Sequence, residues 1–89
     1  MNWYLVSTRP YKREIFLKYL DRAISENKLQ ELILEVIAPQ DKVYQDMVLL
    51  QISNLKEARP HLQQIENFQR LEPKPLPIEQ IRRMSGEMS

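Results

Sequence analysis

The 89-residue sequence contains no cysteine and only one glycine, and each shortage excludes classes of function. Without cysteine there is no disulfide framework, no thiolate metal site and no cysteine nucleophile. The single glycine, Gly86, stands near the end of the sequence. Glycine-rich loops of the kind that cradle phosphate in P-loop and dinucleotide-binding proteins are therefore excluded. Tight turns must instead be made by asparagine, aspartate and the six prolines.

The sequence also lacks a strong net charge and a long apolar run. A formal net charge of +1 gives no global field that would hold nucleic acid or a membrane. No stretch approaches the roughly 18 apolar residues of a membrane helix, and the first residues show no signal-peptide pattern. A chain of 89 residues suits one domain with a modest core. We therefore expect one cytoplasmic domain over residues 1–85, followed by a disordered tail at 86–89.

The first half of the chain alternates between strand and helix patterns. Residues 3–8 are aromatic and β-branched and stop at Arg9-Pro10, which predicts a strand. Apolar pairs spaced four residues apart then predict an amphipathic helix of about 15 residues. Two strands are predicted over residues 31–38 and 43–52, and the short turn at 39–42 makes them antiparallel.

Apolar residues in this hairpin exceed what simple alternation requires. One face is expected to carry Ile33, Ile37, Met47 and Leu49, and the other Leu32, Leu34, Leu50 and Ile52. Two explanations remain open: helices cover both faces of the sheet, or one face carries an exposed apolar patch.

The second half begins with Asn54 and Glu57, which have the spacing of a helix capping box. Pro60 is expected in a first turn or at a break, because proline cannot donate a hydrogen bond inside a helix. Residues 68–71 suit a last strand, residues 73–77 an extended connector, and residues 78–84 a short helix. The predicted fold is an α+β sandwich of the ferredoxin-like kind, in two or three layers. Its element order is βαββαβα and its four-stranded sheet is antiparallel.

No set of residues has the pattern of a catalytic or metal site. His61 is the only histidine, so zinc and nucleophilic-triad arrangements lack their partners, and we interpret it as a solvated helix residue. Nothing in the sequence supplies an apolar pocket that would raise the pKa of a carboxyl group for acid–base work. We expect no enzyme, no metal, no cofactor and no small-molecule substrate. The carboxylates that could form an acid–base pair across the central hairpin are Glu31, Glu35, Asp41 and Asp46.

A basic cluster spans the predicted first helix and the residues before it. It consists of Arg9, Lys12, Arg13, Lys18 and Arg22, offset only by Glu14 and Asp21. A phosphate-facing stripe and an ordinary solvated helix face both fit this pattern. An RNA-recognition motif would place aromatic residues on the central strands, where only Tyr44 qualifies. Contact with nucleic acid is therefore expected to be weak or indirect.

Several motifs together resemble the N-terminal domain (NGN domain) of NusG-family transcription factors. They are the opening Trp3-Tyr4-Leu5-Val6, the amphipathic helix after it, the strand end Glu35-Val36-Ile37-Ala38-Pro39, and the segment from Pro73 to Ile81. The family pattern is W-Y-x-V, a helix, E-V-x-x-P, an F-P-G-Y-V-x-V strand, a helix, a short strand, a proline-rich connector and a last helix. The order and spacing match over residues 3–84.

The resemblance implies a function in transcription. Family members bind the clamp helices of the largest RNA polymerase subunit through an apolar pocket, bridge the DNA cleft and promote elongation. This chain would then be a transcription elongation or antitermination module. By position, the pocket falls on Tyr44, Met47, Leu49, Leu71, Ile81 and Met84.

Three departures from the family pattern leave a second interpretation open. Gln45-Asp46 replaces the Pro-Gly of the docking strand and puts an acid beside the pocket. The insertion between the hairpin strands is missing. No C-terminal KOW domain follows, so the chain resembles a standalone module. The alternative is a non-catalytic, self-associating or adaptor domain that kept the fold and lost polymerase binding.

Overall fold

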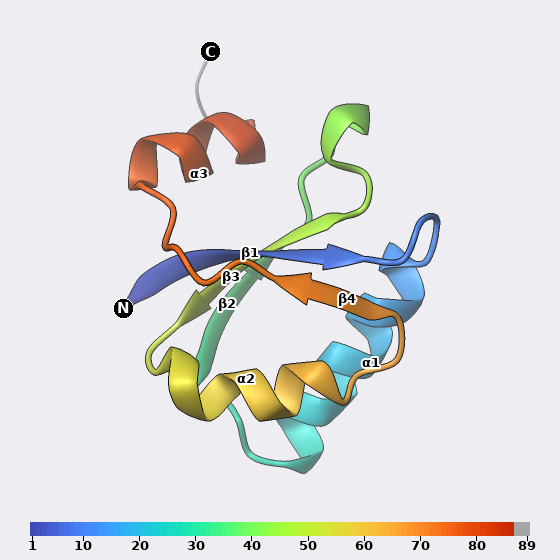
Figure 1. Ribbon diagram of the computed structural model, residues 1–89, viewed down its shortest axis with the longest axis vertical. Helices are drawn as coiled ribbons and strands as arrows, with labels where there is room; N and C mark the ends of the chain where they lie inside the picture. The colour runs from blue at the N-terminus through green and yellow to red at the C-terminus, as the bar shows by residue number, and fades with distance from the viewer. Residues whose placement is uncertain (87–89) are drawn as a thin grey trace.

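Four antiparallel strands form one sheet in the order β2-β3-β1-β4 in the computed structural model, which describes residues 1–86 (Figure 1). The strands are β1 (Asn2–Thr8), β2 (Ile33–Ile37), β3 (Met47–Ile52) and β4 (Phe68–Leu71). The helices are α1 (Arg13–Glu26), α2 (Leu55–Gln63) and α3 (Ile78–Ser85). The predicted element order and the ferredoxin-like α+β class are confirmed. Apart from Gly86, the predicted tail lies outside the described residues.

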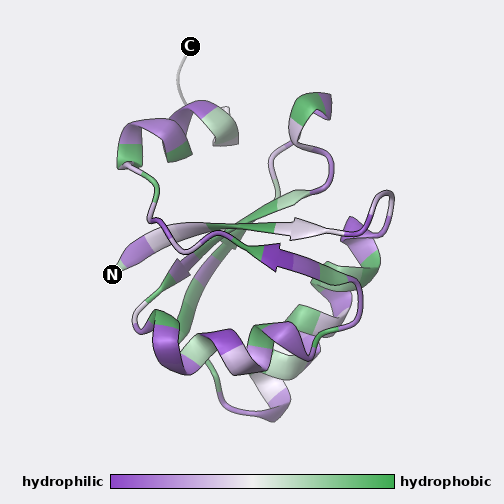
Figure 2. Ribbon diagram, in the orientation of Figure 1, coloured by the Kyte–Doolittle hydropathy of each residue, from purple (hydrophilic) through white to green (hydrophobic). Residues whose placement is uncertain are grey.

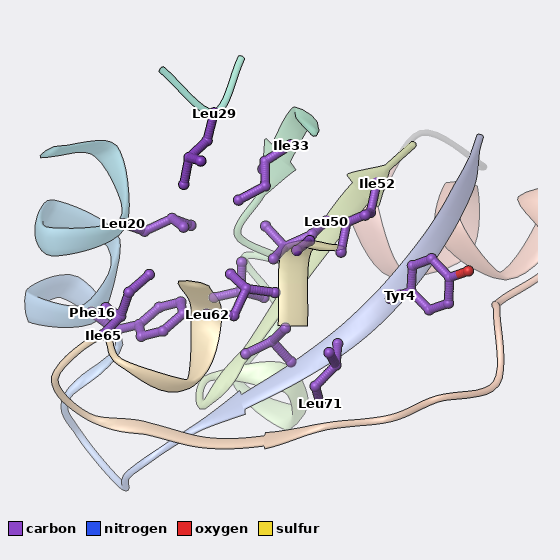
Figure 3. Close-up of a cluster of buried hydrophobic side chains, with 13 residues drawn as sticks. Tyr4, Phe16, Leu20, Leu29, Ile33, Leu50, Ile52, Leu62, Ile65 and Leu71 are labelled. Carbon is purple, nitrogen blue, oxygen red and sulfur yellow. The ribbon is translucent and has the colours of Figure 1, made fainter. Parts of the chain in front are cut away.

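The larger of two apolar clusters lies between the sheet and the helices α1 and α2, which share one face of the sheet (Figures 1 and 3). All four strands contribute to it because every second residue of a strand faces the same side. We call it the α1/α2 cluster. It consists of Tyr4, Val6, Phe16, Leu20, Leu29, Ile33, Val48, Leu50, Ile52, Ala58, Leu62, Ile65 and Leu71.

The smaller cluster lies on the opposite face, where α3 packs on the sheet (Figure 1). Its buried members, Trp3, Leu49, Ile81 and Met84, form what we call the α3 cluster. The connector before α3 is tied to β1 by a hydrogen bond from the N–H of Leu76 to the carbonyl of Trp3 (2.8 Å). Helices therefore cover both faces, and the sandwich has three layers.

Strand β3 alternates as predicted, whereas β2 does not. Val48, Leu50 and Ile52 face the α1/α2 cluster and Leu49 the α3 cluster. The prediction that Ile33 and Ile37 share a face is wrong. A register shift between Ile33 and Glu35 pairs Ile33 with Ile52 but Ile37 with Leu49. An irregularity of this kind turns the residues after it to the other face.

The predicted strand over 43–52 begins later than expected. Residues Lys42–Tyr44 form a 3-10 turn, η1, and β3 starts only at Met47. The Asp41 carboxylate accepts a hydrogen bond from the N–H of Val43 (3.0 Å), which favours a turn over an extended chain. The segment that carries Tyr44 is therefore a loop.

Helix α2 has the predicted cap but not the predicted break. The Asn54 side chain accepts a hydrogen bond from the N–H of Glu57 (3.1 Å), as an N-cap residue does. Pro60 lies inside the helix, so the expectation of a first turn or a break there is wrong. Its ring is exposed, and α2 continues to Gln63 because Ala58 and Leu62 anchor both of its turns in the core.

Polar and apolar residues alternate along each helix (Figure 2), as expected of helices packed on a sheet. Helix α3 ends at Ser85, and Gly86 after it adopts the left-handed conformation (φ 82°) typical of a glycine C-cap. Within residues 1–86, no helix is long and apolar enough to cross a membrane.

Candidate docking surface

The α3 side of the sheet carries apolar residues that α3 covers only in part. Helix α3 has eight residues and buries just Ile81 and Met84. Partly buried apolar residues pack against the α3 cluster, and we call them the α3-side rim. The rim consists of Leu5, Ile37, Tyr44, Met47 and Leu76.

The structure separates the six predicted pocket residues into three groups. Tyr44 and Met47 lie in the α3-side rim and are partly accessible. Leu49, Ile81 and Met84 are buried beneath and within α3, at 0%, 3% and 4% exposure. The six positions therefore do not form one exposed patch.

Leu71 is not brought together with the other five. It pairs with Val6 across β1 and β4, and residues directly opposite each other in an antiparallel pair share a face. Val6 lies in the α1/α2 cluster, and so does Leu71. A surface on the α3 side cannot include it.

The acid of the replaced Pro-Gly pair does not point freely into the rim. The Asp46 carboxylate accepts a hydrogen bond from the N–H of Tyr11 (2.9 Å), in the loop between β1 and α1. The Asp46 carbonyl accepts another from the N–H of Thr8 (2.9 Å). Asp46 therefore joins two loops, and its charge is less of an obstacle to an apolar partner than the sequence suggests.

Arg13 differs from the rest of the predicted basic stripe. Its Nη1 lies within hydrogen-bond distance of three backbone carbonyls, those of Pro39 (2.8 Å), Tyr44 (3.1 Å) and Met47 (3.2 Å). A guanidinium used in this way is not free to face a phosphate. Sequence reasoning missed this role because it placed residues 43–46 in a strand, and no local pattern reveals contacts across 26 to 34 residues.

The other four basic residues are exposed: Arg9, Lys12, Lys18 and Arg22. The guanidinium of Arg22 lies 5.5 Å from the centre of the Tyr19 ring, within the range of a cation–π contact. Glu14 and Asp21 are exposed on the same helix. For these four residues, contact with phosphate stays a prediction.

The histidine and the carboxylates that could act in catalysis are spread over the surface. His61 is exposed on α2 and lines a groove between α1 and α2, opposite Tyr19 and Arg22. Glu31, Glu35 and Asp41 are exposed, and the Asp46 carboxylate accepts the hydrogen bond from the N–H of Tyr11. Among the described residues, no three acidic, histidine or cysteine side chains gather as a metal site would require.

Comparisons with known proteins identify the fold. No family model matches the sequence, and no curated protein does. Solved structures with a similar fold include two Spt4 complexes. One is a crystal structure of the MjSpt4:Spt5 complex, with a TM-score of 0.76 and 12% identity over 92% of this chain. The other is an Spt4 heterodimer complex from Methanococcus jannaschii, with a TM-score of 0.78 and 12% identity over 94% of this chain.

The chain has an NGN-like fold. It spans 53% of the matched chain in the first structure and 95% of that in the second.

Proposed function

We propose that this NGN-like domain is a transcription elongation or antitermination module that docks on the clamp helices of the largest RNA polymerase subunit. The observation that carries the proposal is the α3-side rim, an apolar surface left partly uncovered on the face opposite the main core. Two of its members, Tyr44 and Met47, coincide with the pocket that the NusG resemblance implies. The neighbouring Spt4 and Spt5 complexes support a role in transcription.

The shape around the rim suits a helical partner. Helix α3 and the η1 turn project from the same side of the sheet (Figure 1). Tyr44 is the last residue of η1, and Met47 begins β3 three residues later. An amphipathic helix placed against Tyr44 and Met47 would remove their remaining exposed surface from water, at about 25 cal/mol per Å² of apolar area.

The test measures the affinity of the domain for a purified fragment containing the clamp helices. We expect Met47→Glu to weaken binding at least about tenfold, since it puts a charge at the centre of the contact. Val36→Glu is the matched control: Val36 is 37% exposed, and it pairs with Leu50, on the α1/α2 side of the sheet. The control should bind within about twofold of the wild type.

Two results contradict polymerase docking. One is a wild-type domain that fails to bind the fragment at micromolar concentrations. The other is a Met47→Glu variant that binds as tightly as the wild type while its circular dichroism spectrum shows it to be folded.

A second candidate function is that of an adaptor or self-associating domain, and the edge of the sheet favours it. Within the described residues β2 pairs only with β3, so its outer edge is free, and Leu34 and Val36 there are 39% and 37% exposed. Free edges with exposed apolar residues pair readily with another chain. Both structural neighbours are complexes of two different chains.

Light scattering separates the two functions with the same pair of variants. A dimer that Val36→Glu dissociates and Met47→Glu leaves intact would favour the adaptor, provided that the wild type does not bind the clamp fragment. A wild type that is monomeric at about 100 μM would exclude self-association, because a dimer with an interface of standard size has a Kd well below that concentration.

A further inference from the structure

The connection between β2 and β3, residues 38–46, has little apolar packing to hold it, although it presents Tyr44 to the α3-side rim. Pro39 is buried, but Val43 is 72% exposed and Tyr44 is only partly buried. The polar residues of η1 and its flanks are exposed. Since so few side chains anchor this loop, hydrogen bonds must fix its conformation.

Arg13 supplies the bonds that reach this loop from α1. The three carbonyls facing its Nη1 belong to residues before, within and after the η1 turn: Pro39, Tyr44 and Met47. A charged donor makes hydrogen bonds roughly twice as strong as a neutral one. The planar guanidinium also loses less freedom per bond than a flexible ammonium. One side chain therefore fixes both ends of the segment that leads into the rim.

Asp46 makes the second attachment, to the loop between β1 and α1. Its carboxylate accepts from the N–H of Tyr11, and its carbonyl accepts from the N–H of Thr8. Tyr11 has a left-handed backbone (φ 64°), which a residue with a Cβ adopts at a cost. The Tyr11 side chain is 85% exposed, so the hydrogen bond to Asp46 is the interaction seen to offset that cost.

We infer that Arg13 is a positioning residue of the docking surface: it holds Tyr44 and Met47 in their binding arrangement before a partner arrives. This inference rests on the proposed function. A loop that is ordered for only a fraction of the time binds more weakly by that fraction, since the apparent Kd is the intrinsic Kd divided by the competent population. Arg13 thus contributes to affinity through the backbone of the rim and without contacting the partner.

The experiment compares Arg13→Met with Arg22→Met. Both variants remove one positive charge from α1, but the guanidinium of Arg22 lies over the Tyr19 ring of the same helix, 5.5 Å from its centre. Amide hydrogen exchange is measured at Val43, Tyr44 and Gln45, whose N–H groups bond within the turn. Exchange at the paired amides of β1 and β3 serves as the internal reference. Affinity for the clamp fragment is measured on the same samples.

We expect Arg13→Met to speed exchange at the three turn amides by about tenfold or more and to leave the β1 and β3 amides unchanged. The apparent Kd should rise by the factor by which the protection of these amides shows the ordered fraction of the turn to have fallen, whereas Arg22→Met should match the wild type in both measurements. Arg13→Lys keeps the charge but lacks the planar fork, so it should fall between the two.

Three outcomes overturn the inference. The first is turn exchange that Arg13→Met leaves unchanged, and the second is a turn that exchange shows to be open for most of the time while the affinity stays that of the wild type. The third is an Arg22→Met variant that loses as much affinity as Arg13→Met, which would point to charge alone. If Arg13→Met unfolds, so that the β1 and β3 amides also exchange, Arg13→Lys decides by the same criteria. A wild type that does not bind the fragment overturns the docking function, and the exchange data then show separately whether Arg13 orders the turn.

Discussion

The two faces of the sheet bury very different amounts of apolar structure. The α1/α2 cluster has thirteen buried residues from four strands, two helices and two loops, and the α3 cluster has four buried residues with five more partly buried around it. One face therefore holds the domain together, while the other keeps apolar surface in contact with water. A protein with most of its stability on one face can use the other for binding.

Helix length explains much of this difference. Helix α1 has 14 residues and α2 has nine, and the two lie together over one face. Helix α3 has eight residues, follows a proline-rich connector, and leaves Ile78 47% exposed. A helix this short has almost no stability of its own, so its place depends on Ile81 and Met84.

The largest effect should come from the centre of the α1/α2 cluster. Phe16 is fully buried there, and Phe16→Ala removes a whole ring from a packed interior. We expect a loss of about 3–5 kcal/mol in the free energy of unfolding, which would leave so small a domain barely folded. Urea denaturation followed by circular dichroism measures the loss. A cost below about 1 kcal/mol would show that this cluster is not the main support of the fold.

A matched pair of substitutions compares the two faces directly. Leu62→Ala in the α1/α2 cluster and Ile81→Ala in the α3 cluster each truncate a buried aliphatic residue on a helix. We expect about 3 kcal/mol for Leu62→Ala and about 2 kcal/mol or less for Ile81→Ala, because α3 can shift to close the cavity. Equal losses in the free energy of unfolding, measured by urea denaturation, would show that the two faces do not differ in this way.

Replacing the proline inside α2 should stabilise the domain. Pro60 has no N–H to donate to the carbonyl of Lys56, and its ring is exposed. Pro60→Ala restores the bond but gives the unfolded chain more freedom, so we expect a net gain of about 1–2 kcal/mol. Gln63→Ala, at another exposed site of α2, is the control and should change stability by less than about 0.5 kcal/mol. A loss at Pro60→Ala would mean that α2 needs its bend there.

The parts of the fold that follow local patterns were predictable from the sequence. The alternation of Val48, Leu49 and Leu50 assigned each to the correct face, because β3 is central and regular. Asn54 and Glu57 marked the start of α2 through a contact three residues long. The α+β sandwich followed from the order of such elements, and the NGN-like fold followed from the resemblance of the motifs to the NusG family.

The parts that depend on long-range contacts were not predictable. The register shift in β2 belongs to the pairing with β3, so Ile33 and Ile37 look equivalent in the sequence alone. The η1 turn is held by Arg13, which is 31 residues from Tyr44 in the sequence. Of the six predicted pocket residues, Leu71 therefore lies in the α1/α2 cluster, and Leu49, Ile81 and Met84 are buried on the α3 side.

The smallest expected effect lies at Tyr11, which belongs to neither cluster. Its left-handed backbone (φ 64°) favours asparagine over an aromatic residue, and its side chain is 85% exposed. The hydrogen bond to Asp46 comes from the main chain, so Tyr11→Asn keeps it. We expect a gain of about 0.5–1 kcal/mol in urea denaturation, whereas Tyr11→Gly should gain less because glycine makes the unfolded chain more flexible. A loss of stability in Tyr11→Asn would show that the exposed ring supports the loop, and the bond to Asp46 would then not be what holds this backbone.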